Sequence, residues 1–388
     1  MLSKLTKFSL IAIGLFAGPG VIFLLPYVVS QVSYANFIKI LTVSQLIALI
    51  GGAGLDVGCA RLKIPIRRAS TLLISTTIIS AVIVILISKS LSWIDVVVVF
   101  VAGLITAIST MYQSYFLFRG NSLAYGGFGF FRSLTMLILL VIFIKLGYEV
   151  SVSWGVATFF GFIVAVGLVR RSFYENSLEK DGFNKSVMEI IKFSLPFFLI
   201  NGAAVIPFLM DKLISQKYLS LDDFSKYMVV TTWAIPILYL GNIYQQYLIA
   251  NYDIKNRENL IKKIFLLFFA GLSYVVLVIG VVKYLVHIPF FKNVDDFIEI
   301  WIIVGFWYAL YSGLAYPAAA CVQKKMEEKS LSSLSKCSAI AFPLSLMTAF
   351  FSVLFLWNDF GMYAAVLFAA IFAFLMLAPR VYFVWRML

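Results

Sequence analysis

A few charged side chains interrupt the long apolar runs of this chain, and they are the residues best placed to do chemistry. Arg132 lies about eight residues into such a run and Lys336 near the start of another, where a cation can bind an anionic group. Asp56 and Asp211 lie in comparable runs, where a carboxylate can take up a proton or a sodium ion. A charge inside a membrane costs roughly 2.5–3.5 kcal/mol on insertion scales, so each of the four needs a reason.

Other polar residues stand close to these charges along the chain. Lys212 follows Asp211 directly, which leaves open a neutralising pair, an ion-coupling carboxylate beside an anion-binding amine, or a simple interfacial anchor. Arg61 follows Asp56 within LDVGCAR and either binds an anion or belongs to the basic cluster that continues to Arg68. Uncharged groups inside the runs that can hydrogen-bond a ligand, or a neighbouring helix, are Tyr112, Tyr244, Gln245 and Tyr316.

The elements that must position these side chains are membrane helices. Of the 388 residues, 62% are hydrophobic and 13% charged, a balance typical of an integral membrane protein. A bilayer-spanning helix needs roughly 20 apolar residues. Twelve stretches meet this need, near residues 8–29, 37–59, 70–88, 94–118, 124–146, 152–169, 194–214, 227–250, 263–285, 297–321, 335–356 and 361–379.

The distribution of Lys and Arg predicts the orientation of these helices. With a cytoplasmic N-terminus, most Lys and every Arg fall on the cytoplasmic side, so we expect both termini there. The formal net charge of +13 is then mainly a topology signal and a means of contact with anionic membrane lipids. Nucleic-acid binding is not expected, because no basic soluble domain is present.

An internal repeat divides the chain into two halves. KFSL opens an apolar run at Lys7 and again at Lys192, and KFSLIAIGLFAGPGVIFLLPYVVS matches KFSLPFFLINGAAVIPFLMDKLIS in register. We therefore predict an all-α polytopic protein with two homologous six-helix bundles, residues 1–185 and 186–388. Because six is even, both halves enter the membrane from the same side, a parallel repeat typical of transporters.

Several chemistries lack the residues that they require. There is no P-loop, and the single histidine, His287, has no neighbouring Cys or second His to form a zinc site. No loop is large enough for an extramembrane catalytic domain. We expect a protein that is not an enzyme and that holds no metal or organic cofactor.

The chain resembles the O-antigen and exopolysaccharide flippases (Wzx) of the multidrug/oligosaccharidyl-lipid/polysaccharide (MOP) exporter superfamily. The resemblance rests on the two six-helix halves, the opening KFSL, GGAGLDVGCAR at the end of the second run, and FRGNSLAYGGFGFFRS before the fifth. It implies a MATE-like fold in the bacterial inner membrane. It also implies translocation of undecaprenyl-diphosphate-linked oligosaccharides by alternating access, coupled to H⁺ or Na⁺, with other polysaccharide assembly proteins as further partners.

Given this resemblance, the polar residues acquire provisional roles. Arg132 and Lys336, one in each half, would bind the diphosphate with Lys212 and Arg61, while Tyr112, Tyr316, Tyr244 and Gln245 would contact the sugars. Asp56 and Asp211 would couple transport to the ion gradient. Two alternatives stay open: a cation-coupled multidrug exporter of the MATE type, for which an acidic cavity is expected, and a membrane-embedded glycan polymerase or ligase.

Overall fold

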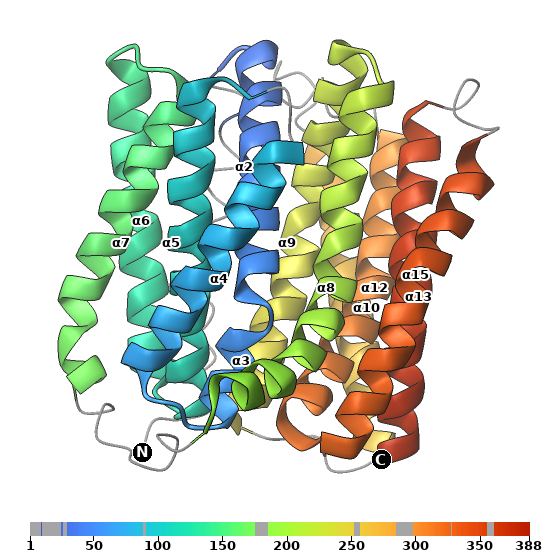
Figure 1. Cartoon of the computed structure of the whole chain (residues 1–388). Coiled ribbons are helices and arrows are strands. Elements are labelled where there is room, and N and C mark those ends of the chain that lie inside the picture. Colours follow the sequence, from blue (N-terminus) through green and yellow to red (C-terminus); the bar gives the residue numbers. More distant parts are fainter. Residues whose placement is uncertain are drawn as a thin grey trace. The chain divides into compact units, whose positions relative to one another are not determined.

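A computed structural model gives the fold of the chain, and it describes residues 9, 25, 29–87, 91–174, 185–251, 257–284, 298–326, 328–354 and 361–388. Twelve helices and no strand occur among these residues (Figure 1). The helices are α2 Gln31–Gly52, α3 Leu55–Arg61, α4 Ile66–Ile87, α5 Trp93–Phe118, α6 Ser122–Lys145, α7 Val150–Tyr174, α8 Val187–Tyr218, α9 Leu221–Asn251, α10 Arg257–Tyr284, α12 Ile298–Lys325, α13 Glu328–Leu354 and α15 Met362–Met387.

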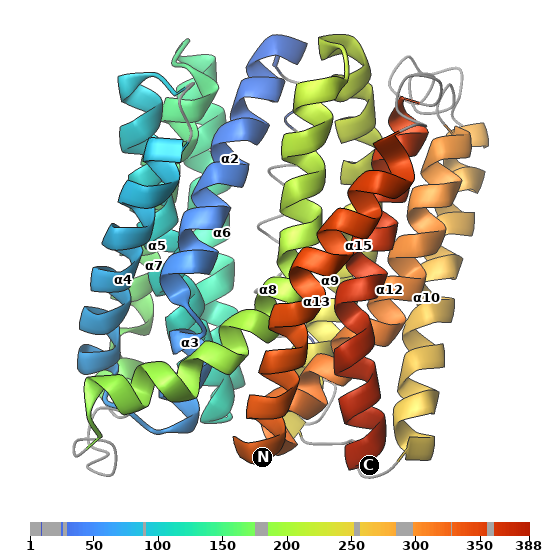
Figure 2. The same cartoon turned by 45° about the vertical axis from the view of Figure 1, so that its right-hand side comes forward.

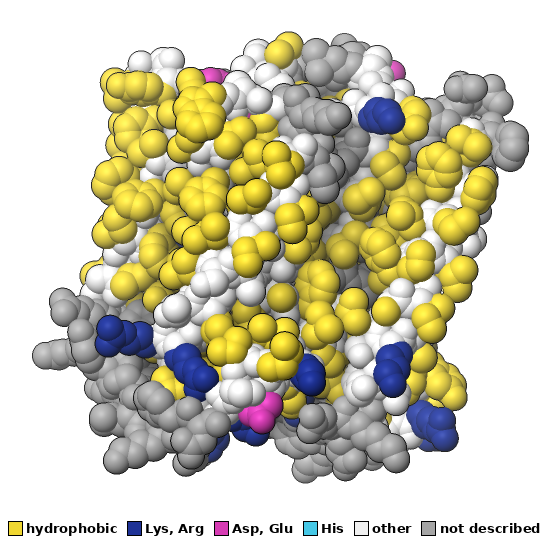
Figure 3. Space-filling model, viewed as in Figure 1, with side chains coloured by type: hydrophobic (Ala, Val, Ile, Leu, Met, Phe, Trp, Pro, Cys, Tyr) yellow, Lys and Arg dark blue, Asp and Glu magenta, His cyan; other side chains and the backbone are white. Residues whose placement is uncertain are grey.

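The predicted all-helical membrane architecture is confirmed. Nine spans among the described residues are long and apolar enough to cross a membrane. Many apolar side chains on these helices are exposed, as lipid-facing side chains are, and Figure 3 shows them covering the middle of the helices in view. The chain is a multi-pass membrane protein. The first predicted run, 8–29, and His287 lie outside the described residues.

Two helices extend well beyond their predicted spans. The structure begins α8 at Val187, where Ser186 and Glu189 form reciprocal hydrogen bonds that cap its first turn. It ends α15 at Met387, although the predicted span stopped at 379. Hydropathy detects only the hydrocarbon thickness, whereas a capped helix continues into the headgroup region.

The predicted stretch 37–59 lies within Val32–Arg61, which is long and apolar enough to cross a membrane, but its helix is interrupted at one point. The chain breaks between α2 and α3, where Ala53 and Gly54 have φ angles of 42° and 71°. Gly54 suits this left-handed conformation because it has no Cβ. A Cβ there would also meet the backbone of α8 at Ser194 and Phe198.

The described residues fall into two compact units. Unit 1 contains α2 from Asn36 onward, α3 to α7 and α8 up to Gly202. Unit 2 contains the start of α2 up to Ala35, the rest of α8, α9 up to Leu248, and α10, α12, α13 and α15. The last residues of α9, Ile249–Asn251, belong to unit 1. The predicted division into homologous halves, 1–185 and 186–388, stays a prediction.

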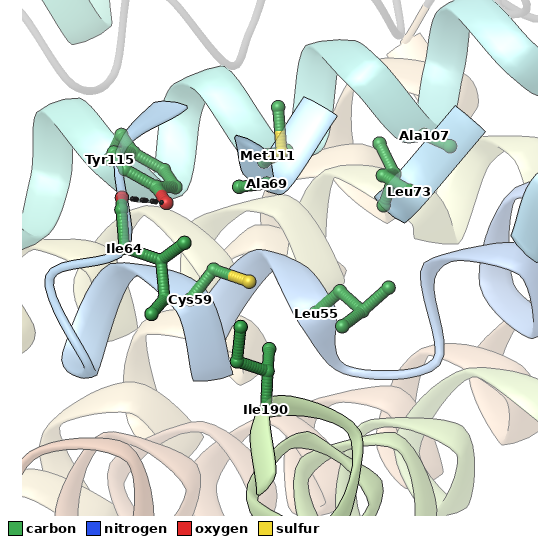
Figure 4. Packing of buried hydrophobic residues seen from close by; sticks show 9 residues of the cluster. All are labelled: Leu55, Cys59, Ile64, Ala69, Leu73, Ala107, Met111, Tyr115 and Ile190. Carbon is green, nitrogen blue, oxygen red and sulfur yellow. Dashed lines mark hydrogen bonds between the residues drawn. The ribbon is translucent and has the colours of Figure 1, made fainter. Parts of the chain in front are cut away.

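Unit 1 has a tightly packed core where α3 meets α4, α5 and the first turns of α8. Figure 4 shows its buried side chains, and the Tyr115 hydroxyl donates a hydrogen bond of 2.6 Å to the carbonyl oxygen of Ile64. That bond satisfies a backbone group in the short turn between α3 and α4. Ile190 brings α8 into the same cluster. This core fixes the segment that carries Asp56 and Arg61.

Unit 2 packs α8 against three other helices. Ile206, Met210 and Ile214 contact a buried cluster of α13 and α15 side chains. On another side of the helix, the Phe208 ring stacks on Trp307 of α12, with ring centroids 5.3 Å apart. These contacts fix the rotation of α8 about its axis and therefore the direction in which Asp211 points.

Candidate functional site

Asp211 is a buried acid on α8, in the part of this helix that belongs to unit 2. Its side chain is 2% exposed, and one carboxylate oxygen accepts hydrogen bonds from the Tyr227 hydroxyl at 2.6 Å and from the Ser215 hydroxyl at 3.4 Å. Ser215 lies one turn along α8, and Tyr227 reaches across from α9. Hydroxyl donors offset part of the cost of burying this carboxyl group.

The surroundings of Asp211 are hydroxyl-rich on one side and apolar on the other. Tyr308 of α12 lies near enough to interact electrostatically with the carboxylate, and so does Lys212, its neighbour along α8. The helices packed on the other side of α8 contribute the apolar cluster of α13 and α15. In this environment, the charged form of the Asp211 carboxyl group is much more costly in free energy than the protonated form unless it has hydrogen-bond donors or a cation beside it.

Asp56 occupies the first turn of α3 in unit 1 and is partly buried. The Ser114 hydroxyl of α5 donates a hydrogen bond of 3.3 Å to its carboxylate. By surface exposure, this acid is less enclosed than Asp211. Both residues are now placed beside hydroxyl donors, although their coupling role stays a prediction.

Arg61 has partners of a different kind. Its guanidinium lies over the rings of Phe193 and Phe197 in α8, 5.8 and 5.3 Å from their centroids. Cation–π contacts of this type hold α3 against the first turns of α8. Arg61 thus has a packing role in addition to any anion-binding role.

The predicted basic pair is divided between the two units. Arg132 is partly buried on α6 of unit 1, within electrostatic range of Tyr125. Lys336 is exposed on α13 of unit 2, which also suits a lysine that extends to the lipid headgroups. Joint binding of a diphosphate by these two side chains remains a prediction.

The predicted sugar-contacting residues lie in three separate surroundings. In unit 1, the Tyr112 ring stacks on Phe162 and meets Phe128 edge-on, both at 6.1 Å. In unit 2, the Tyr316 ring faces Gly241 so closely that a Cβ on this glycine would overlap it.

Tyr244 and Gln245, also in unit 2, lie near the end of α9. The Tyr244 ring stacks on Tyr247 at 6.2 Å and carries the Lys263 ammonium 5.7 Å from its centroid. Gln245 is buried beside them. The contacts of Tyr112 and Tyr316 are mainly packing contacts, whereas Tyr244 combines packing with a cation.

Comparison with known proteins identifies the fold. No family model matches the sequence, and no curated protein matches it. Among solved structures, it is similar to an outward-facing multidrug resistance MATE transporter of the MOP superfamily, with a TM-score of 0.63, 15% identity and coverage of 100% of this chain and 96% of that one. For the MATE multidrug transporter DinF-BH in complex with rhodamine 6G, the TM-score is 0.58 and the sequence identity is 14%. The match covers 99% of this chain and 95% of that one.

A mutant of the Vibrio cholerae MATE transporter VcmN gives a TM-score of 0.55 at 13% identity, with 98% of each chain covered. The chain has the MATE fold. This confirms the predicted MATE-like architecture over essentially the whole chain. The narrower resemblance to Wzx flippases finds no match at the sequence level and is not confirmed.

Within this MATE fold, the sequence prediction missed one charged residue. Arg380 was expected in the cytoplasmic tail after a helix ending at 379, but it lies inside α15 and is 2% exposed. Tyr311 and Tyr316 of α12 are within its electrostatic range. The apolar residues that follow Pro379 were a signal that the span continues.

Tyr227, the hydroxyl donor to Asp211, was also missed. Nothing in the sequence distinguishes it from the other tyrosines of the chain, because its role depends on how α9 packs beside α8. Among the described residues, no group of three or more His, Cys, Asp or Glu could hold a metal ion.

Proposed function

We propose that this protein is an ion-coupled exporter that works by alternating access. The MATE fold over the whole chain supports a transporter, and the buried Asp211 carboxyl group supports coupling to an ion gradient. It is this buried acid that carries the proposal, because an acid with 2% exposure in the predicted span 194–214 has no evident value as a surface or solubility group.

The chemistry of coupling follows from the two states of the Asp211 carboxyl group. When charged, it needs the Tyr227 and Ser215 hydroxyls as donors, or a bound cation, to remain in an apolar environment. When protonated, it tolerates loss of these partners. Uptake and release of a proton or sodium ion would therefore favour different packing of α8 against α9.

For the substrate, we propose an amphipathic organic molecule of the multidrug type. The solved structures of similar fold are described as MATE multidrug transporters, and one is in complex with rhodamine 6G.

An efflux assay tests this proposal. Bacterial cells that lack their own exporters are loaded with the dye rhodamine 6G, and efflux is followed by fluorescence with wild-type protein and with Asp211→Asn. We expect efflux with the wild type only. Glu258→Gln is the matched control, because it removes an exposed carboxylate that pairs with Lys262. Equal efflux with wild type and Asp211→Asn would refute the coupling role.

A second candidate substrate is an undecaprenyl-diphosphate-linked oligosaccharide. It is favoured by the resemblance to Wzx flippases and by the enclosed Arg380 guanidinium near Tyr311 and Tyr316, a combination that suits phosphate and sugar groups. In this reading the protein is a flippase of the bacterial inner membrane, working with other polysaccharide assembly proteins.

Genetic complementation separates the two substrates. The gene is deleted in its host and restored as wild type, Arg132→Ala or Lys336→Ala, with membrane abundance and surface polysaccharide both measured. A flippase predicts loss of surface polysaccharide on deletion and incomplete rescue by Arg132→Ala at normal abundance. If surface polysaccharide is unchanged after deletion, the flippase reading is refuted and the multidrug proposal is the one that remains.

A further inference from the structure

One end of unit 1 carries a concentration of cations that the transport proposal does not use. We define the basic face as Lys63, Arg67, Arg68, Lys185 and Lys192. Four of these side chains are exposed, and Arg68 is partly buried. Among the described residues around them, Glu189 is the one exposed acid, and it is engaged in capping α8. The local charge is therefore strongly positive.

Specific contacts bring the basic face together from three chain segments. Arg68, in the first turn of α4, donates a hydrogen bond of 2.6 Å to the carbonyl oxygen of Lys185, just before α8. Arg61 of α3 lies on the Phe193 and Phe197 rings of α8. Figure 2 shows the first part of α8 passing across the lower end of α4 and beside α3. These contacts bring the first turns of α4 and α8 beside the end of α3, and all five cations lie on these three segments.

Lys63 has an unusual backbone conformation for a residue with a side chain. Its φ is 54°, in the turn where the Ile64 amide donates to the Cys59 carbonyl and closes the end of α3. Glycine is the usual residue at this position of a helix end, because its left-handed conformation disfavours a Cβ. A lysine here strains the backbone but adds an exposed cation.

Apolar side chains lie beside these cations on the outer side of α8. Met188 is 61% exposed and Leu195, two turns further along the same side, is 47% exposed, with Lys192 between them. The opposite side of the same turns is buried through Ile190, Ser194 and Phe197. Exposed apolar groups interleaved with lysines are typical of a segment at the boundary between lipid headgroups and acyl chains. Figure 3 shows Lys and Arg along the same end of the molecule, with apolar side chains directly beyond them.

We propose that the basic face is a binding site for an anionic phospholipid of the surrounding membrane. The phosphate-bearing headgroup contacts the cations, and the glycerol and upper acyl chains contact Met188 and Leu195. The lipid thereby fastens the first turns of α8 to α3 and α4. This inference does not depend on which substrate the protein transports.

Lipid titration of the purified full-length protein tests the proposal. In an uncharged detergent, the midpoint of thermal unfolding is measured with dioleoyl-phosphatidylglycerol and with dioleoyl-phosphatidylcholine, which have the same acyl chains. We expect saturable stabilisation by phosphatidylglycerol, and its loss at high salt because exposed charges are screened. Equal stabilisation by the two lipids, or an effect insensitive to salt, overturns the proposal.

Two sets of variants identify the site. Lys63→Gln, Arg67→Gln and Lys192→Gln together should weaken phosphatidylglycerol binding by on the order of 100-fold, at roughly fivefold for each cation. The matched control removes three exposed lysines of unit 2, Lys217, Lys262 and Lys283, also by change to Gln. Equal weakening in both sets means nonspecific charge attraction and overturns the assignment.

Two further measurements exclude alternative explanations. Lys63→Gly should raise the unfolding midpoint without lipid, because glycine relieves the backbone, and lower the gain from phosphatidylglycerol. If phosphatidylglycerol raises the unfolding midpoint of Lys63→Gly as much as that of the wild type, Lys63 does not bind the lipid and its assignment to the site is overturned. Inorganic phosphate is titrated in parallel, and stabilisation equal to that by phosphatidylglycerol indicates a site for free phosphate and overturns the lipid proposal.

Discussion

The Tyr227 hydroxyl donates a 2.6 Å hydrogen bond to the Asp211 carboxylate, and the two side chains are almost completely buried in unit 2. This contact joins α8 to α9 at the most enclosed acid among the described residues. The loss of this hydrogen bond costs more free energy when the Asp211 carboxyl group is charged than when it is protonated. Substitutions of either residue therefore separate structural from coupling roles.

Asp211→Asn should abolish ion-coupled transport while leaving the fold intact. The amide oxygen of Asn still accepts the Tyr227 hydrogen bond, but the side chain no longer takes up a proton or binds a cation strongly. In proteoliposomes, accumulation of rhodamine 6G driven by an imposed proton or sodium gradient should fall to background. Binding of the dye measured without a gradient should remain. Gradient-driven accumulation by the variant at the wild-type rate would contradict the coupling role.

Tyr227→Phe should destabilise the protein and slow transport without abolishing it. The phenyl ring keeps the packing, but a buried acceptor loses its strongest donor, at a cost of about 1–3 kcal/mol. Denaturant unfolding monitored by fluorescence in detergent measures this difference. Ser220→Ala, which removes the hydroxyl that bonds Asp223 at the exposed start of α9, is a control that leaves Asp211 untouched. A transport rate unchanged in Tyr227→Phe would show that this bond has no role in coupling.

Tyr115→Phe should loosen the turn between α3 and α4. The Tyr115 hydroxyl satisfies the Ile64 carbonyl inside the cluster shown in Figure 4, so its removal leaves a buried backbone acceptor unpaired. We expect a loss of about 1–3 kcal/mol in the free energy of unfolding. Accelerated labelling of an engineered cysteine at exposed Lys63 would report the local opening. Identical unfolding midpoints for Tyr115→Phe and the wild type would show that this hydrogen bond does not stabilise the turn.

The orientation predicted from the positive charges has its own test. A green fluorescent protein fused after Leu388 should be fluorescent, because this reporter folds in the bacterial cytoplasm and not after export through the general secretion pathway. Alkaline phosphatase at the same position should be inactive. The reverse pattern would place the C-terminus outside and invert the predicted topology.

The sequence was sufficient for the helices but not for their contacts. Apolar runs of bilayer length predicted the spans well, since each span is determined by its own residues. The break at Gly54 was missed because it depends on the approach of α8, which lies far away in the chain. Arg380 was misplaced because the predicted span stopped at 379, one residue before it. The Tyr227 partner of Asp211 was missed because it depends on how two helices pack.

Gly58→Ala tests whether the close approach of α3 to α8 is required for the fold of unit 1. A Cβ at Gly58 would lie 2.9 Å from the Ser194 Cα, so a backbone must shift. Small residues permit such close helix contacts in membrane proteins. We expect a loss of about 1–3 kcal/mol in stability, as for other overpacked sites.

Gly52→Ala is the matched control for this substitution. A Cβ at Gly52 meets no atom within 4 Å, and alanine is the better helix former at the end of α2. This variant should therefore be as stable as the wild type or more stable by up to about 1 kcal/mol. If the unfolding midpoints of Gly58→Ala and Gly52→Ala are the same, α3 and α8 can move apart without loss of stability. In that case the close packing at Gly58 is not what holds Arg61 on Phe193 and Phe197. If stability is lost in Gly58→Ala but not in Gly52→Ala, the close contact of Gly58 with Ser194 is required for the fold. The positions of Asp56 and Arg61 on α3 then depend on this contact.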